Sequence, residues 1–115
     1  MSAYHQVFGL VGDLLVPTVA QAQTLLEGSI MPAPPEGMLH LTATADTYTG
    51  LLTVTASYRR YDHEGHPRVA HRHEAVDTVS LLTAPDFLDR CTSLRQRLAL
   101  AVLARWHDLY APPAP

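Results

Sequence analysis

The chain of 115 residues contains no lysine, no asparagine and a single isoleucine, Ile30. These three amino acids have AT-rich codons, so their scarcity reflects a GC-rich coding sequence and says nothing about the fold. Every basic side chain that is always charged is therefore an arginine, and the arginines cannot be interpreted as a choice of guanidinium over ammonium chemistry. All eight lie between Arg59 and Arg105, so the first half of the chain has no basic residue besides histidine.

Cysteine is almost absent, since Cys91 is the only one. A single cysteine excludes an internal disulfide and any metal site built from several thiolates. Long apolar runs are missing too, because no segment approaches the roughly 20 residues that a membrane-spanning helix needs. The apolar residues 7–16 are interrupted by Asp13 and follow no positively charged segment, which argues against a signal peptide. We therefore expect a soluble protein without a membrane partner, located in the cytoplasm or incorporated in an assembled particle.

Charge is scarce as well. Charged residues make up 17% of the chain and hydrophobic residues 47%, whereas an average globular domain has about 25% charged residues. A small domain so poor in charge leaves apolar side chains at its surface, where they commonly mark a protein contact. The net charge of -3 gives no general attraction to nucleic acid or anionic lipid. The length fits a single domain, which we place at residues 1–111, followed by a proline-rich tail at 112–115.

The first third of the chain has the periodicity of a helix. Apolar residues recur at intervals of four and three from Tyr4 to Leu26. Pro17 removes a backbone donor, so we expect either one N-terminal helix or a kinked helix pair. In the second case the first helix would reach Leu15, although this segment could instead be an extended arm. Gly28 suits the left-handed conformation that ends many helices.

The middle of the chain is typical of strands. Alternating apolar and polar residues predict strands at 38–45 and 51–61, and β-branched residues predict a third at 68–82. The period of two indicates a sheet with one covered face. A stiff proline-rich connector at 31–37 separates these strands from the N-terminal helix.

A turn at 63–67 joins the last two strands into a long hairpin. Pairing the strands outward from this turn would bring Tyr58 near His71 and Ala56 near His73. A slip of one residue would exchange the two faces of the hairpin, so this register depends on the geometry of the turn.

The last third predicts one long helix from residue 84 to residue 110, because apolar residues recur there with helical spacing. Thr83 and Asp86 resemble a capping box at its start. Together the elements predict an α+β fold. It consists of an N-terminal helix or kinked helix pair, a three-stranded antiparallel meander with a long hairpin, and a long C-terminal helix packed on the sheet.

Residues 98–104 are apolar on every side of this predicted helix. Such a helix is covered on more than one side. The sheet would cover one side, and either a second subunit or the N-terminal helices would cover the other. The residues that we select for a subunit contact are Leu100, Leu103, Trp106 and Tyr110.

The hairpin is a second candidate contact, because basic side chains outnumber acidic ones there. Guanidinium groups bind carboxylates and phosphates. An acidic protein with one modest basic patch favours a protein partner over nucleic acid. The candidate residues are Arg59, Arg60, Arg68 and Arg72.

The histidines of the hairpin allow a metal site. His71 and His73 alternate along one strand, and His40 or Glu64 could supply a third ligand. Arg72 between them would repel a cation. The sequence has no nucleophile elbow, phosphate-binding loop or dinucleotide fingerprint, so we expect no catalytic residues and no cofactor.

These observations predict a non-enzymatic structural subunit that associates with itself or belongs to a larger complex. The same order of elements occurs in small phage tail-terminator and neck proteins and in dimeric secretion chaperones, an analogy of fold alone. It suggests the tail or neck of a phage-like particle as one setting. The alternative is a small ligand- or metal-binding domain that uses the histidine-rich hairpin at 63–73.

Overall fold

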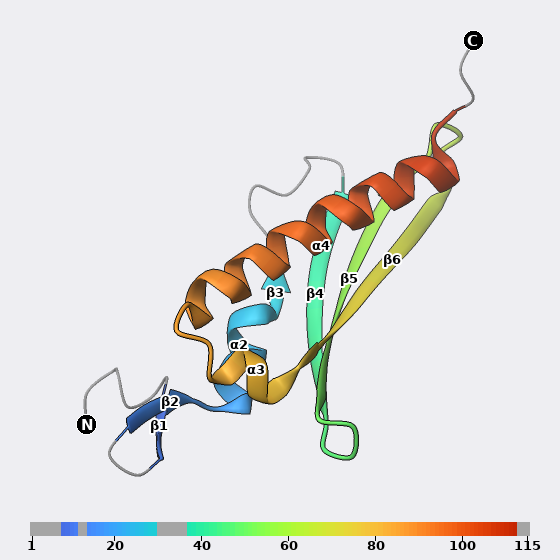
Figure 1. Cartoon of the computed structure of the whole chain (residues 1–115). Helices are drawn as coiled ribbons and strands as arrows, with labels where there is room; N and C mark the ends of the chain where they lie inside the picture. The colour runs from blue at the N-terminus through green and yellow to red at the C-terminus, as the bar shows by residue number, and fades with distance from the viewer. Residues whose placement is uncertain (1–7, 12–13, 30–36, 113–115) are drawn as a thin grey trace.

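The structure is a computed structural model that describes residues 8–11, 14–29 and 37–112. Its elements in chain order are β1 (Phe8–Val11), β2 (Leu14–Pro17), α2 (Val19–Leu26), β3 (Gly28–Ser29), β4 (Gly37–Asp46), β5 (Leu51–Tyr61), β6 (Pro67–Asp77), α3 (Thr78–Leu82) and α4 (Phe87–Tyr110). The strands β3 to β6 form one antiparallel sheet in that spatial order, and α4 crosses one face of it (Figure 1). The predicted α+β fold is confirmed, and the short strand β3 is added to the predicted meander.

The hydrophobic core lies between the sheet and the helices. Alternate residues of β4 and β5 point into it and are at most 2% exposed: Leu39, Leu41, Leu52, Val54, Ala56 and Tyr58. The helix α4 contributes residues at the predicted spacing, each at most 5% exposed: Phe87, Cys91, Leu94, Leu98, Val102 and Trp106. The period of two in the strands and the helical period in α4 therefore place the residues that face each other.

The segment before α2 is extended. The strands β1 and β2 pair with each other along their whole length, so a first helix up to Leu15, as in a kinked helix pair, is wrong. Gly9 and the β-branched valines near it disfavour a helix there. The single helix α2 begins after Thr18, whose side chain accepts a hydrogen bond from the N–H of Gln21 at 3.2 Å. Gly28 follows this helix with a φ of 105°, the positive value that its position predicted.

The pairing of β5 with β6 differs by one residue from the predicted register. Tyr58 lies opposite Ala70 instead of His71, and Ala56 lies opposite Arg72 instead of His73. The shift exchanges the faces of β6, so both histidines point away from α4 and are exposed.

The register is set by Asp62 in the hairpin turn. Its carboxylate accepts hydrogen bonds from the backbone N–H groups of Glu64 and His66, each at 2.9 Å. Its own N–H donates to the carbonyl of His66 at 2.9 Å. Gly65 completes the turn with a φ of 82°. Asp62 and His66 therefore face each other, and the pairs along β5 and β6 follow from them.

The chain leaves β6 through the short helix α3, which replaces the end of the strand predicted at 68–82. Asp77 causes this change, because its carboxylate caps the helix by accepting the N–H of Ser80 at 2.8 Å. Thr83 bonds back to the carbonyl of Val79. It therefore does not cap α4, and α4 begins at Phe87 rather than at residue 84.

Two predicted segments fall largely outside the described residues. The connector at 31–37 is described only at Gly37, and the tail at 112–115 only at Pro112. Within the part of the chain that the structure describes, no helix is both long enough and apolar enough to cross a membrane.

Candidate interaction surface

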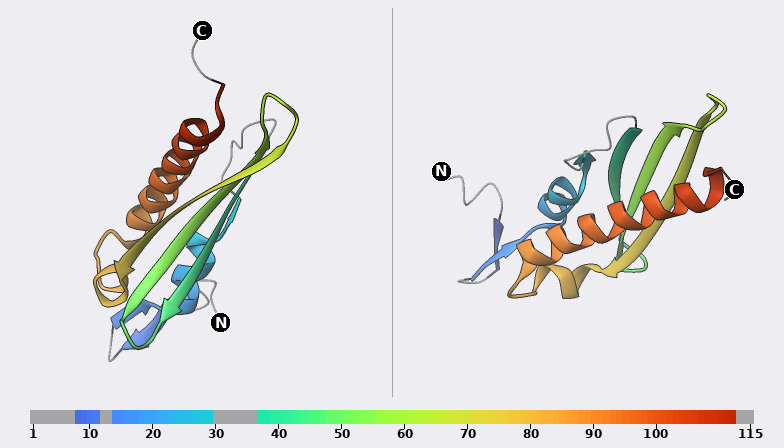
Figure 2. Two further views of the ribbon diagram at one scale, coloured as in Figure 1. Left: turned by 90° about the vertical axis from the view of Figure 1, so that its right-hand side faces the viewer. Right: turned by 90° about the horizontal axis from the view of Figure 1, so that it is seen from above.

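The sheet has a second face, directed away from α4, that no described element covers (Figure 2). We call it the open face. It consists of the residues of β4, β5 and β6 that alternate with the core residues, and they are exposed or half-buried. Nearly half of them are threonine, serine or histidine, whose polar groups can remain in contact with water.

Apolar side chains gather on the open face near the hairpin turn. Met38, Arg59 and Val69 lie side by side across β4, β5 and β6. The exposed fractions are 70% for Met38, 42% for Val69 and 66% for Tyr61, which lies opposite Pro67 at the end of the hairpin. We call these five residues the open-face patch. An exposed group of apolar side chains on a small domain is a candidate contact surface.

A shallow hollow of about 480 Å³ lies on this patch. Its lining combines patch residues with His40, Ser57 and His71, which form the next row across the three strands. His73 lies one row further, opposite Thr55. Among residues 8–11, 14–29 and 37–112, no three histidine, cysteine or acidic side chains come together as a metal site.

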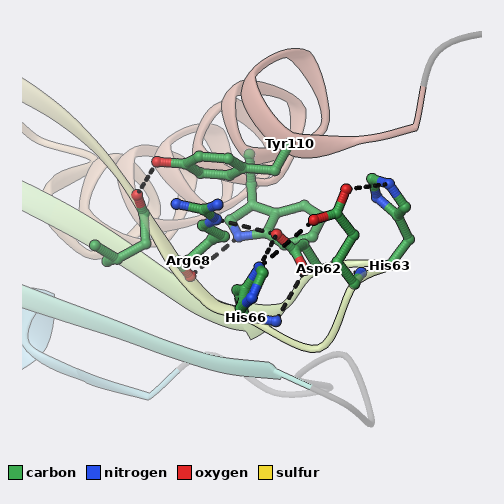
Figure 3. A network of polar contacts seen from close by, with 8 residues as sticks. Asp62, His63, His66, Arg68 and Tyr110 are labelled. Atoms are coloured by element: carbon green, nitrogen blue, oxygen red, sulfur yellow. Dashed lines mark hydrogen bonds and ion pairs between the residues drawn. The ribbon is translucent and has the colours of Figure 1, made fainter.

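The four arginines predicted for a hairpin contact divide between the two faces. The guanidinium of Arg60 lies 5.4 Å from the centre of the Trp106 ring, and that of Arg68 lies 5.6 Å from the centre of the Tyr110 ring. Arg68 also donates from Nε to the Asp62 carboxylate at 3.0 Å, as Figure 3 shows. These two arginines attach the end of α4 to the hairpin within the chain.

The other two arginines are exposed. Arg59 belongs to the open-face patch, whereas Arg72 points to the side of α4 and lies near the free edge of the sheet. Neither makes an ion pair with a described residue. They remain candidates for a contact with another molecule.

The Asp62 carboxylate is the most strongly perturbed acid among the described residues. The N–H groups of His66 and Glu64 and the guanidinium of Arg68 all favour its charged form. They hold the pKa of Asp62 at about 2. His63 and His66 lie beside the same turn and contact Glu64 (Figure 3). The hydrogen bonds of the turn that fixes the register therefore account for the lowered pKa.

The residues predicted for a contact along α4 differ in accessibility. Leu100 is 69% exposed and lies on the side of α4 opposite the core. Leu103 is half-buried against the core, and Trp106 is only 4% exposed. The indole of Trp106 and the hydroxyl of Tyr110 donate to the carbonyls of β6 at 3.2 and 3.0 Å. Leu100 therefore offers a partner the most surface, while Trp106 and Tyr110 mainly hold the chain's own core and hairpin.

Sequence reasoning missed the patch residues Met38 and Val69. They come from two separate strands, and only the registers of both strands with β5 bring them together. A signal was present, however. Each is an apolar residue out of phase with the buried positions of its own strand, where a hydrophilic residue is expected.

Comparison with known proteins finds no match: no family model, no curated protein and no solved structure is similar to this chain. Its function therefore has to follow from the chemistry of the described residues.

Proposed function

We propose that this chain is a non-enzymatic subunit that works by assembling with itself or within a larger complex, of which a phage-like particle is one setting. The observation that carries the proposal is the open-face patch. The exposed fractions of Met38, Tyr61 and Val69 are 42% to 70%, and these side chains lie together on a sheet face that no described element covers. Removing apolar surface from water stabilises an association by roughly 25 cal/mol for each Å² buried.

The composition of the patch supports a protein contact. Arg59 lies between Met38 and Val69, and His40 and His71 lie in the next row of the same face. Methionine and arginine are both enriched in protein interfaces. Ser57 supplies the hydroxyl in the lining of the hollow, and it donates to the backbone carbonyl of His40 at 3.4 Å rather than to a base. The arrangement that activates a serine nucleophile needs a base within hydrogen-bond reach of the hydroxyl.

The test is the absolute mass in solution, measured by light scattering behind a sizing column at two concentrations and two salt levels. We expect a closed oligomer for the wild type. We expect Met38→Glu to lower the mass, because it replaces the most exposed large apolar side chain of the patch with a charge. Thr44→Glu is the matched control, since it adds the same charge to the same face of β4 outside the patch.

A mass of 12.6 kDa at every concentration would contradict self-assembly. An oligomer that Met38→Glu leaves unchanged would exclude the patch as the contact and retain the assembly. Leu100→Glu then asks whether the exposed side of α4 supplies the contact instead.

A ligand- or metal-binding role is the second candidate, and the hollow between His40 and His71 favours it. Metal analysis of protein purified without a histidine tag tests this role. Stoichiometric zinc or nickel that disappears in His40→Ala/His71→Ala but persists in His63→Ala would support it. Protein free of metal after incubation with either ion would contradict the metal site.

A further inference from the structure

The strand β6 is the last strand of the sheet. It pairs with β5 on one side, and its other edge pairs with no described strand. Figure 2 (left) looks toward this edge. Unpaired N–H and C=O groups along an edge strand are a template for a further strand.

Two hydrogen bonds show which backbone groups of β6 point outward. The N–H of Asp62 donates to the carbonyl of His66, and the N–H of Thr78 donates to the carbonyl of Gly50, both at 2.9 Å. Both bonds join even-numbered residues that continue the register of β5 with β6. Hydrogen-bonded and non-hydrogen-bonded pairs alternate along an antiparallel ladder. The even-numbered residues of β6 therefore bond to β5, and the odd-numbered residues direct their backbone groups outward.

The outward groups differ along the strand. The carbonyl of Val69 accepts the hydroxyl of Tyr110 at 3.0 Å, so α4 already satisfies the edge at this end. The next outward backbone groups belong to His71, His73 and Ala75. On the side away from β5, these groups have no strand partner among the described residues. The unsatisfied stretch is thus the second half of β6.

Two charged side chains lie between these outward residues, on the side of α4. Both carboxylate oxygens of Glu74 accept hydrogen bonds from Arg97, from Nε at 3.1 Å and from Nη2 at 2.5 Å, and the side chain stays partly exposed. Arg72 has no ion pair with a described residue. Charges on an edge strand normally protect it against indiscriminate pairing. One charge of each sign, two residues apart, leaves one antiparallel register that is favourable for a second copy of the same strand.

In that register His73 of one copy lies opposite His73 of the other. Arg72 of each copy then lies opposite Glu74 of the other, and opposite charges in facing positions stabilise a sheet. The strand can also be shifted in either direction to the next register in which the odd-numbered residues of the two copies still face each other. One shift places Arg72 opposite Arg72, and the other places Glu74 opposite Glu74. Like charges in facing positions are destabilising, so both shifts are disfavoured.

We propose that β6 pairs with β6 of a second copy in this register and joins the two sheets across a two-fold axis. The proposal rests on the proposed function, because it specifies how the subunit associates with itself. His71, His73 and Ala75 of one copy exchange backbone hydrogen bonds with Ala75, His73 and His71 of the other. The axis is perpendicular to the sheet, so both α4 helices lie on one face. Both open-face patches lie on the other face, toward opposite ends of the paired strands, because Val69 is four residues from the axis at His73. A contact through the patch is therefore separate from the contact through β6 and would join one dimer to another.

Charge exchange between two variants is the first experiment. In a homodimer, Arg72→Glu places the introduced carboxylate opposite Glu74, and Glu74→Arg places the introduced guanidinium opposite Arg72. Each substitution replaces two attractive pairs by two repulsive ones, and we expect the dimer Kd to rise about tenfold or more. An equimolar mixture of the two variants restores opposite charges at both positions. We expect it to recover the wild-type mass in light scattering.

Loss of one outward backbone donor is the second experiment. The N–H of Ala75 points outward, so Ala75→Pro removes it without removing a hydrogen bond to β5. We expect this variant to have a lower mass than the wild type at the same concentration. Ala75→Ser keeps the N–H and is the matched control. Near-UV circular dichroism from Trp106 verifies that both variants are folded.

The outcomes separate the two proposals. An oligomer that survives Ala75→Pro and both charge variants would overturn pairing through β6 and leave the proposed function in place. A monomer at every concentration would overturn pairing through β6 and the self-assembly part of the proposed function. A dimer that is lost in folded Ala75→Pro but is insensitive to the charge variants would overturn the register. If Ala75→Pro does not fold, the mixing experiment still decides, because failure of the mixture to dimerise contradicts the pairing.

Discussion

The strands β4, β5 and β6 form both faces of the sheet, and the two faces differ in residue type and in exposure. On β5 the face toward α4 carries Leu52, Val54 and Tyr58, each at most 1% exposed. The open face of the same strand carries hydroxyl residues, including Thr53 and Thr55, which are half-buried by their neighbours alone. The closed face needs a cover and receives it from α4. The open face consists largely of side chains that water can solvate, and its patch is the exception.

The strongest way to break this comparison is to remove a large side chain from the closed face. Trp106 is 4% exposed, and its ring lies 5.9 Å from the Tyr58 ring. We expect Trp106→Ala to lower the free energy of unfolding by about 3 to 5 kcal/mol, measured by urea denaturation. Leu100→Ala on the exposed side of α4 should change it by less than about 0.5 kcal/mol. Equal effects would contradict the packing of α4 described above.

A smaller change adds one methyl group to the closed side. A Cβ at Gly37 would overlap the ring of Tyr58, so the ring would have to move. We expect Gly37→Ala to reduce the free energy of unfolding by about 1 to 3 kcal/mol. Thr44→Val, at an exposed position of the same strand, should have an effect within about 0.5 kcal/mol. If Gly37→Ala were as stable as the wild type, the close approach of Tyr58 to β4 would be wrong.

The hydroxyl of Tyr58 allows a finer test of the closed face. It is buried and has no hydrogen-bond partner among the described residues. Removing a polar group that is buried without a partner is neutral or favourable. We therefore expect Tyr58→Phe to leave the free energy of unfolding unchanged or to raise it by up to about 1 kcal/mol. A clear decrease in thermal and urea stability would show that the hydroxyl has a partner.

We expect the smallest effect on folding stability at the hairpin turn, because the turn lies at the surface. The effect expected there is a dependence of the stability on pH. The pKa of Asp62 is about 2 in the folded chain, below its ordinary value of 3.8. A lowered pKa means that the carboxylate stabilises the fold above pH 3.8, and that this contribution is lost as the pH falls from 3.8 through about 2. The urea midpoint of the wild type should therefore approach that of Asp62→Asn in this range. If the difference between the urea midpoints of the wild type and Asp62→Asn were the same at pH 5 and at pH 2, the stabilising role of the carboxylate would be contradicted.

The sequence predicted those parts of the fold that depend on local periodicity. The bounds of β5 agree with the predicted strand at 51–61, and the buried residues of α4 lie at the predicted spacing. His71 and His73 do share one face, because alternation along a strand needs no knowledge of its partner. The exposure of Leu100 also follows from local periodicity. A helix segment that is apolar on every side has apolar residues on the side that the sheet does not cover.

The sequence did not predict features that depend on a specific side chain meeting a distant or competing backbone group. The carboxylate of Asp62 shifted the hairpin register by one residue, and that of Asp77 turned the end of a predicted strand into α3. The sequence also did not predict that Trp106 is buried, because its ring is covered where α4 meets the hairpin.

The sequence by itself thus determined which residues face the core, because the periods of strand and helix are properties of the local backbone. Only the tertiary structure decided which residues meet across strands. The open-face patch joins Met38, Arg59 and Val69 through two strand registers, and the outward groups of β6 follow from the turn at Asp62. The physical reason is that a register is fixed by a few hydrogen bonds at the turns. A change of one residue there moves every side chain of the strand to the other face.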